Sequence, residues 1–171
     1  LDKYERVIYI KSFSKVFLPG IRLGYMITPS SFNETIQSSK INTDIATSSL
    51  MQRALEVYIS EGLWRKNINY QQRLYKEKYL LMKELINKEI SDKVSYIDPK
   101  GGLYFYLEIK NKNINSQELF YKLKKKKLFI TPGTILFKDS SNGNYFFRIS
   151  FSQVSKKKIV EGINLIKEEL I

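Results

Sequence analysis

Near its start, the chain alternates apolar and polar residues in a way that predicts two strands joined by a loop. Residues 6–10 alternate weakly and are typical of a buried strand, and residues 21–27 return to an apolar run. Between them, residues 12–20 contain several polar positions and the pair Pro19-Gly20, which interrupts regular structure. We therefore expect a unit made of a strand, a loop and a second strand.

A helical spacing of apolar residues follows over residues 32–60. One face of this stretch carries Leu50, Met51, Ala54, Leu55, Tyr58 and Ile59. Gly62 is suited to end that helix. Apolar residues then recur at helical spacing between Trp64 and Ile90, which predicts one helix over residues 63–90, about 40 Å long. A helix of this length suits a connection between two lobes.

The last part of the chain mixes short strand patterns with helical ones. We expect strands at residues 94–97, 103–109, 128–131 and 145–151. We expect one helix capped by Ser116, with Leu119, Phe120 and Leu123 facing inward, and a final helix capped by Ser155, with Ile159, Val160, Ile163 and Ile166 on one stripe. The order strand, strand, helix, strand, strand, helix predicts an α+β lobe.

Composition narrows the class of protein. The 171 residues are 43% hydrophobic and 13% aromatic, which is enough for a packed core. The apolar runs are far shorter than the roughly 20 residues of a membrane span, so we expect no membrane association. The first residues show no secretory signal, and we expect a cytoplasmic protein. Because the chain begins with Leu1 and enters a strand pattern almost at once, we expect a C-terminal fragment of a longer protein.

Two residue types are missing altogether. The sequence contains no cysteine, which excludes disulfides and thiol chemistry, and no histidine. The usual zinc sites and histidine-based triads are therefore excluded, and we expect no metal. Any general base in this chain must be Lys, Tyr, Asp or Glu.

The net charge of +12 raises the question of a nucleic-acid partner. The excess is mostly lysine spread along the chain, densest at residues 124–127 and again at 156–158. We interpret these runs as solvated helix ends, with contact to an acidic partner as the alternative. Charge alone does not identify a DNA-binding domain.

The first loop contains residue types that together suit a phosphorylated aldehyde. A lysine amine must be neutral part of the time to attack an aldehyde, and burial or nearby cations favour that state. Lys15 lies beside the apolar Val16 and Phe17 in the sequence, and we expect these neighbours to bury it in part. A phosphate needs hydroxyl donors and usually a guanidinium, whose planar fork binds two oxygens at once. Ser12, Ser14 and Arg22 supply that set close to the lysine.

At these residues the chain resembles a known family. Residues 12–25, SFSKVFLPGIRLGY, are similar to the Schiff-base loop of fold-type I pyridoxal-phosphate enzymes, the class I/II aminotransferases. The resemblance is greatest to the subgroup that contains the aminoadipate and kynurenine aminotransferases and the MocR regulators. Three later strings match the family in the same order: PKGGLYF at residues 99–105, ITPG at 130–133 and FRISFS at 147–152.

The resemblance implies roles for five residues. Lys15 corresponds to the catalytic lysine that holds pyridoxal phosphate as a Schiff base and shuttles a proton. Ser12, Ser14 and Arg22 correspond to the positions that bind the cofactor phosphate. Arg148 corresponds to the arginine that binds the substrate α-carboxylate, with a surface arginine on an edge strand as the alternative.

The resemblance also implies a fold and a division into domains. The fold class is α/β with an α+β C-terminal lobe, a part of the fold-type I aminotransferase fold. Residues 1–62 would be the end of the cofactor-binding large domain, residues 63–92 the connecting helix, and residues 93–171 the complete small domain. The family's groups at the pyridine nitrogen, at O3′ and on the ring face lie upstream of the lysine, outside this chain. We therefore expect residues 1–171 alone to have negligible transaminase activity.

Three functions stay open. The first is a homodimeric pyridoxal-phosphate-dependent transaminase that moves an amino group between an amino acid and a 2-oxo acid. The second is the aminotransferase-like effector domain of a MocR/GntR-type regulator, which would use the cofactor as a sensor and bind nucleic acid only through an upstream helix-turn-helix domain. The third is an unrelated α/β binding module. The sequence that precedes residue 1 would distinguish the first two.

Overall fold

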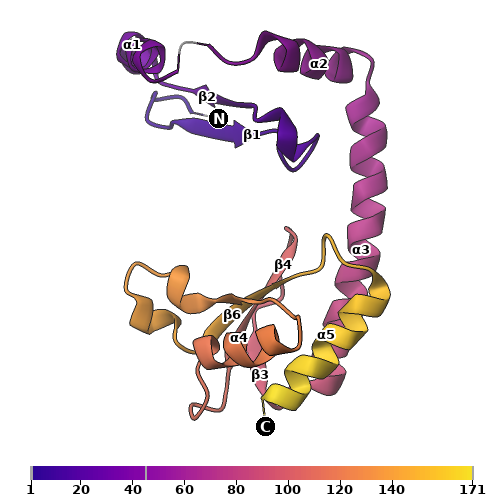
Figure 1. The fold of residues 1–171 in the computed structure, drawn as a ribbon. Helices are drawn as coiled ribbons and strands as arrows, with labels where there is room; N and C mark the ends of the chain where they lie inside the picture. Colours follow the sequence, from indigo (N-terminus) through magenta and orange to yellow (C-terminus); the bar gives the residue numbers. More distant parts are fainter. Residues whose placement is uncertain (1, 45, 171) are drawn as a thin grey trace. The chain divides into compact units, whose positions relative to one another are not determined.

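The computed structural model describes residues 2–44 and 46–170, which form an α/β structure of strands and helices (Figure 1). The chain divides into two compact units, Leu1–Gln71 and Gln72–Ile171. The boundary between them falls within the long helix α3 (Leu63–Glu89). This helix agrees with the prediction for residues 63–90 to within one residue, because its apolar periodicity is long and uninterrupted.

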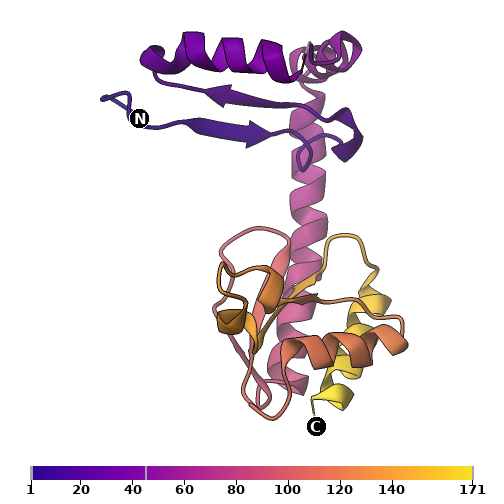
Figure 2. The same ribbon diagram turned by 60° about the vertical axis from the view of Figure 1, so that its left-hand side comes forward.

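The first unit is built on a β-hairpin. Its elements are, in chain order, β1 (Tyr9–Ser12), η1 (Pro19–Ile21), β2 (Gly24–Ile27), η2 (Ser30–Phe32), α1 (Asn33–Thr43) and α2 (Ser49–Ser60). The strands β1 and β2 are antiparallel, with Tyr9 opposite Ile27 and Ser12 opposite Gly24. Figure 2 shows the two strands side by side, with α1 running along them. The predicted strand–loop–strand unit is confirmed.

Two expectations for this unit are wrong. The buried strand expected at residues 6–10 begins at Tyr9, and all of its residues are exposed. The helix α1, which runs along the two strands, likewise contributes no buried residue. The helix expected over residues 32–60 is two helices, because Asp44 has extended backbone and the Ser48 side chain caps α2 by accepting from the Met51 N–H. The end of α2 near Gly62, whose φ is +67°, is confirmed.

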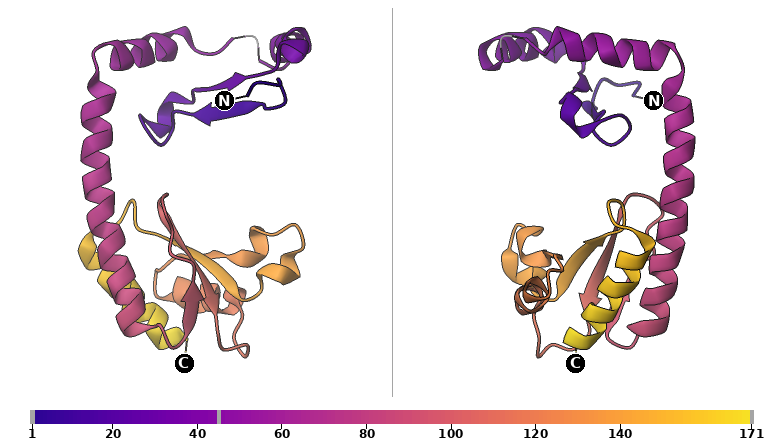
Figure 3. Two further views of the ribbon diagram at one scale, coloured as in Figure 1. Left: turned by 180° about the vertical axis from the view of Figure 1, so that it is seen from behind. Right: turned by 45° about the vertical axis from the view of Figure 1, so that its right-hand side comes forward.

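The second unit contains an antiparallel sheet with the strand order β3-β4-β6-β5. Its elements after α3 are β3 (Val94–Tyr96), β4 (Tyr104–Ile109), α4 (Ser116–Lys125), β5 (Thr131–Pro132), η3 (Gly133–Ile135), η4 (Ser140–Gly143), β6 (Phe146–Ser150) and α5 (Lys156–Glu169). Figure 3 shows α5 beside the C-terminal half of α3. The predicted order of strands and helices in an α+β lobe is confirmed.

One face of this sheet is buried against the helices. The core joins Phe105, Leu107, Ile109, Phe147 and Ile149 of the sheet to Met82, Ile86, Leu119, Leu123, Ile159, Ile163 and Ile166 of the helices. Alternate residues of β4 and β6 point to the opposite face, as the period of two in a strand requires. That face carries Tyr104, Tyr106 and Arg148.

The helix caps of the second unit are partly as expected. Ser155 caps α5 by accepting from the Lys158 N–H, which confirms the prediction. The cap expected at Ser116 is wrong, because the N-cap of α4 is Asn115, which forms a capping box with Glu118. Ser116 is instead a buried residue of the first turn, and its hydroxyl donates to the Gly143 carbonyl at 3.3 Å.

Two further details differ from the prediction. The strand expected at residues 128–131 is reduced to β5, because Lys127 has a φ of +62° and the Leu128 N–H donates to the Leu123 carbonyl at 3.0 Å, closing α4. Val160 is 37% exposed and lies beside the buried stripe of α5 rather than on it.

None of the helices in residues 2–44 and 46–170 has the length and hydropathy to cross a membrane.

Candidate functional site

The hairpin places Ser12 and Ser14 in contact. The Ser12 hydroxyl donates to the Ser14 hydroxyl at 3.0 Å and accepts from the Ser14 N–H at 3.2 Å. Opposite Ser12, the residue Gly24 lies so close to β1 that a Cβ there would be 2.8 Å from the Lys11 carbonyl oxygen. A glycine at this position therefore permits the close pairing that holds the two serines at the end of the hairpin.

Arg22 has left-handed backbone, with φ 51° and ψ 35°, directly after η1. This conformation costs roughly 1–2 kcal/mol in a residue with a side chain, so surrounding contacts must hold it. Its neighbours Ile21 and Leu23 are both buried, while Arg22 is exposed. The unusual backbone thus buries both apolar neighbours and leaves the guanidinium exposed, with Nη1 3.5 Å from the Pro19 carbonyl oxygen.

Ser12, Ser14 and Arg22 line the same hollow in the first unit. Its volume is about 640 Å³, and its wall also contains Lys40. The size lies within the range of small-molecule sites. Hydroxyl donors together with a guanidinium are the groups that bind a phosphate dianion. The donor set therefore fits the phosphate of pyridoxal phosphate, the cofactor that the resemblance implies.

Lys15 lies in the turn that joins these groups, although it does not line the hollow. The turn is closed by the Val16 and Phe17 N–H groups, which donate to the Phe13 carbonyl at 3.2 Å and 2.9 Å. The expectation that apolar neighbours bury Lys15 is wrong for this chain, because Val16 and Phe17 are half-buried and Lys15 is exposed. The side chains of successive residues in a turn point in different directions, so the apolar neighbours in the sequence do not cover the Lys15 side chain. Among the described residues, its amine makes no hydrogen bond or ion pair.

Arg148 belongs to the second unit and lies on an inner strand. β6 has β4 on one side and β5 on the other, which excludes the interpretation of Arg148 as an edge-strand residue. Its Cζ lies 4.5 Å from the centre of the Tyr104 ring, a cation–π contact. Its Nη2 donates to the Thr131 hydroxyl at 3.4 Å. The guanidinium is thereby oriented, and its remaining N–H groups can bind a carboxylate.

Sequence reasoning missed Tyr104, Thr131 and Tyr106 as neighbours of Arg148. Thr131 and Tyr106 are its cross-strand partners. Burial raises the pKa of the Tyr106 phenol above its usual range, which favours the neutral form of this side chain. The alternation of β4 could have placed Tyr104 and Tyr106 on one face, but their alignment with Arg148 depends on strand register, which the sequence does not state.

The turn at residues 99–102 borders a second hollow, within the second unit and of about 750 Å³. Tyr79 and Asp98 also line it, and the Tyr79 hydroxyl donates to Asp98 at 2.7 Å. This bond raises the pKa of Tyr79, and an ion pair with Lys83 lowers the pKa of Asp98. Gly102, with a φ of +90°, allows the turn to form.

The predicted site residues thus fall into two sets. Ser12, Ser14 and Arg22 lie together, with Lys15 in the same loop, and Arg148 lies on the sheet of the second unit. Within residues 2–44 and 46–170, no cluster of three or more Asp or Glu side chains could hold a metal ion.

Comparison with known proteins gives concordant matches. The family model for aminotransferase class I and II matches residues 1–166. An uncharacterized aminotransferase of Saccharolobus solfataricus is 33% identical over 99% of this chain and 43% of its own length. An uncharacterized HTH-type transcriptional regulator of Bacillus subtilis, YisV, is 27% identical over 98% of this chain and 34% of its own length.

A solved structure agrees with these sequence matches. The crystal structure of Pyrococcus horikoshii kynurenine aminotransferase, in complex with PMP, superposes with a TM-score of 0.92 at 27% identity. The alignment covers 99% of this chain and 41% of that one. The chain therefore spans less than half the length of the proteins that it matches.

Proposed function

The chain belongs to the class I and II aminotransferase family, and we propose that it is part of an enzyme that moves an amino group between an amino acid and a 2-oxo acid. The observation that carries the proposal is the gathering of Ser12, Ser14 and Arg22 around one hollow, in the same unit as Lys15. A phosphate site beside a lysine is the arrangement that a phosphorylated aldehyde cofactor requires. The kynurenine aminotransferase, whose structure contains PMP, supports the same cofactor chemistry.

Pyridoxal phosphate, when bound, supplies an aldehyde that accepts the amino group and a ring that withdraws electrons from it. In this chain, Ser12, Ser14 and Arg22 would hold the phosphate through hydroxyl and guanidinium donors. Lys15 would hold the cofactor through its amine and, when released, would hold and return a proton at Nζ.

Arg148 would bind the α-carboxylate of the amino acid or 2-oxo acid. Its position supports this role, because Tyr104 and Thr131 orient the guanidinium on an exposed sheet face. A guanidinium binds a carboxylate through two parallel hydrogen bonds, which fixes the direction of the substrate as well as its affinity.

The proposal extends to the organisation of the whole protein. Residues 1–62 would be the end of a large cofactor-binding domain, and residues 93–171 would form the small domain. Residues 63–92 would form the helix that connects these two domains. The whole protein would be a homodimer in the cytoplasm. Light scattering of the purified protein and fractionation of cells test these two points.

The activity is tested by assaying the whole protein with amino acids and 2-oxo acids in the presence of pyridoxal phosphate. We expect Lys15→Ala to abolish amino transfer. The matched control is Lys11→Ala, because Lys11 lies on β1 and lines the same hollow but stands outside the proposed chemistry. Amino transfer that persists in the Lys15→Ala variant would refute the proposed role.

A second function is favoured by relatives that are named as transcriptional regulators. The Bacillus subtilis match is named as an HTH-type transcriptional regulator, and its similarity covers nearly all of this chain. In that case the same residues would bind pyridoxal phosphate as a sensor, within a MocR/GntR-type protein whose helix-turn-helix domain binds nucleic acid. Specific DNA binding that changes with the cofactor, without amino transfer, would favour the regulator over the enzyme.

A further inference from the structure

The backbone directly after Lys15 is held by two side chains that are distant in sequence. The Val16 carbonyl oxygen accepts from the Tyr58 hydroxyl at 3.2 Å and from the Asn67 side-chain amide at 3.1 Å. Asn67 Nδ2 also donates to the Tyr58 hydroxyl at 2.8 Å, so the three groups form a closed set. Tyr58 lies on α2 and Asn67 on α3, and the whole set belongs to the first unit.

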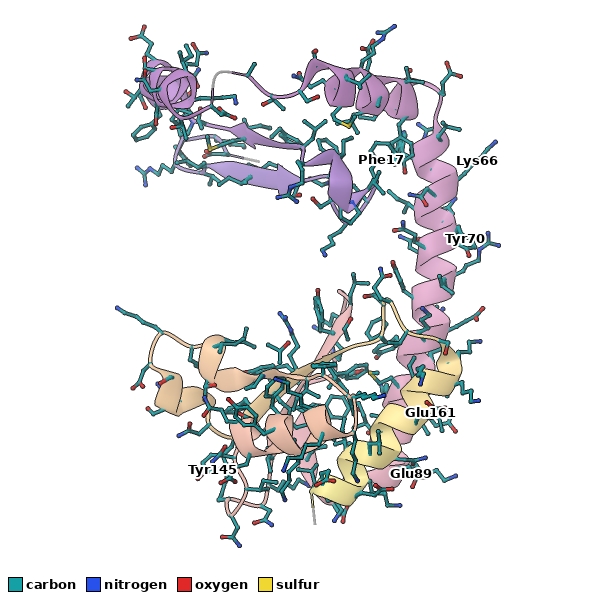
Figure 4. All side chains as sticks on the ribbon, in the orientation of Figure 1. Phe17, Lys66, Tyr70, Glu89, Tyr145 and Glu161 are labelled. Atoms are coloured by element: carbon teal, nitrogen blue, oxygen red, sulfur yellow. The ribbon has the colours of Figure 1, made fainter. Side chains whose placement is uncertain are left out.

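Packing supports the same attachment. The Phe17 ring stacks on the Tyr58 ring, with centroids 4.0 Å apart and planes 22° apart. Figure 4 shows the Phe17 side chain beside the N-terminal end of α3. Gln71, one turn further along α3, donates to the Asn67 side-chain oxygen at 3.3 Å and so fixes the orientation of the Asn67 amide. Residues 16 and 17 are therefore attached to both helices through hydrogen bonds and a ring stack.

The Lys15 side chain, unlike the backbone beside it, is not held by contacts within the part of the chain that the structure describes. The Lys15 side chain is exposed and has no partner among the described residues, so contacts to the amine do not define its position. The region that its amine can reach is set by the position of its backbone. That backbone is fixed on one side by the Phe13 turn and on the other by the Val16 carbonyl.

We infer that Tyr58 and Asn67 are positioning residues, which hold the loop so that the Lys15 amine points to a cofactor in the hollow of Ser12, Ser14 and Arg22. The inference rests on the proposed function, because it gives the loop geometry a role in cofactor attachment. A well-placed amine reacts faster than a mobile one because less orientational freedom is lost on reaction.

The test uses the whole protein and two variants. Tyr58→Phe removes the hydroxyl but keeps the ring stacked on Phe17, and Asn67→Leu removes the amide at similar volume. Tyr70→Phe and Asn69→Leu are matched controls, because both residues are exposed positions of α3. The proteins are treated with pyridoxal phosphate, reduced with borohydride at successive times, and digested so that mass spectrometry measures the label on Lys15.

We expect Asn67→Leu to slow labelling of Lys15 roughly tenfold and Tyr58→Phe to slow it severalfold, with both controls unchanged. Hydrogen exchange of the Val16 and Phe17 amides should become faster in the same two variants, since it reports loop opening without any cofactor. Tyr58→Phe preserves most of the packing, so it still decides the question if Asn67→Leu does not fold.

The results separate the inference from the proposed function. If native protein takes no label on Lys15, the proposed function and the inference both fail. If native protein is labelled and the two variants are labelled at the same rate, the inference alone fails. Slower labelling without faster exchange of the loop amides would also overturn it, because the effect would then not pass through the loop.

Discussion

A single methyl group at Gly133 should destabilise the second unit strongly. Gly133 follows β5, and a Cβ built there would lie 2.5 Å from the Gly143 oxygen, 2.7 Å from the Phe146 oxygen and 2.8 Å from the Phe146 Cβ. Ordinary contacts begin at 3.4 Å, so the shortfalls are 0.9, 0.7 and 0.6 Å (3.4 minus each distance). Two of the three atoms belong to the backbone and cannot rotate away, so the backbone of η3, at the end of β5, must move away from η4 and β6.

The size of the effect follows from this geometry. Overpacking by a methyl group costs about 1–3 kcal/mol, and we expect Gly133→Ala near the upper end because backbone atoms form the obstacle. The matched control is Gly101→Ala, since a Cβ at Gly101 meets nothing within 4 Å. That change should alter the free energy of unfolding by no more than about 0.5 kcal/mol.

Urea unfolding followed by circular dichroism measures both variants against the native chain. The transition of the second unit should shift to lower urea in Gly133→Ala, at nearly unchanged slope, and stay in place in Gly101→Ala. Equal stability of the two variants would show that the close contacts at Gly133 do not limit the residue there. Because Thr131 and Arg148 are paired across β5 and β6, a displaced β5 should also weaken substrate binding in the whole protein.

Three further changes have defined outcomes. Phe105→Ala should lower the free energy of unfolding by about 3–5 kcal/mol in urea titrations, because Phe105 is fully buried; a loss below about 1 kcal/mol would contradict the core assignment. The bond from Lys167 lowers the pKa of Glu89 below its ordinary 4.5, so the pair stabilises above that pH and loses its effect as pH falls through the lowered value. A double-mutant cycle of Glu89→Gln and Lys167→Met, measured by urea unfolding, should therefore show a coupling free energy at neutral pH and none in acid. Coupling that persists in acid would contradict the assignment of the effect to the ionised Glu89. Arg148→Lys should reduce kcat/KM of the whole protein about 10- to 100-fold through loss of the bidentate fork, and an unchanged kcat/KM would exclude the carboxylate role.

Much of the fold could be predicted from the sequence where periodicity is long or local. The apolar spacing of α3 extends over many turns, so its existence and ends were predictable. The inward positions Leu119 and Leu123 followed from the same rule and are fully buried. The N-cap of α4 could not be predicted from the sequence, because Asn115 and Ser116 are both good capping residues. Which of them caps the helix depends on the buried contact of Ser116 with Gly143.

The environment of the site was less predictable. The resemblance to the class I/II aminotransferases pointed to Lys15 and Arg148 as site residues. The contacts around these two residues, however, join parts of the chain that are far apart in the sequence. Tyr58 reaches the loop across 42 residues, and no local pattern marks such a contact. The exposure of Lys15 likewise reflects tertiary structure, because apolar sequence neighbours need not cover a side chain.

The proposed role of Lys15 is to hold pyridoxal phosphate through its amine. The most direct measurement is to incubate the whole protein with pyridoxal phosphate, reduce it with borohydride and map the modified peptide by mass spectrometry. We expect one stoichiometric phosphopyridoxyl label, on Lys15, which excess inorganic phosphate reduces by competing for Ser12, Ser14 and Arg22. A label distributed over the exposed lysines, insensitive to phosphate and unchanged in Lys15→Ala, would contradict it.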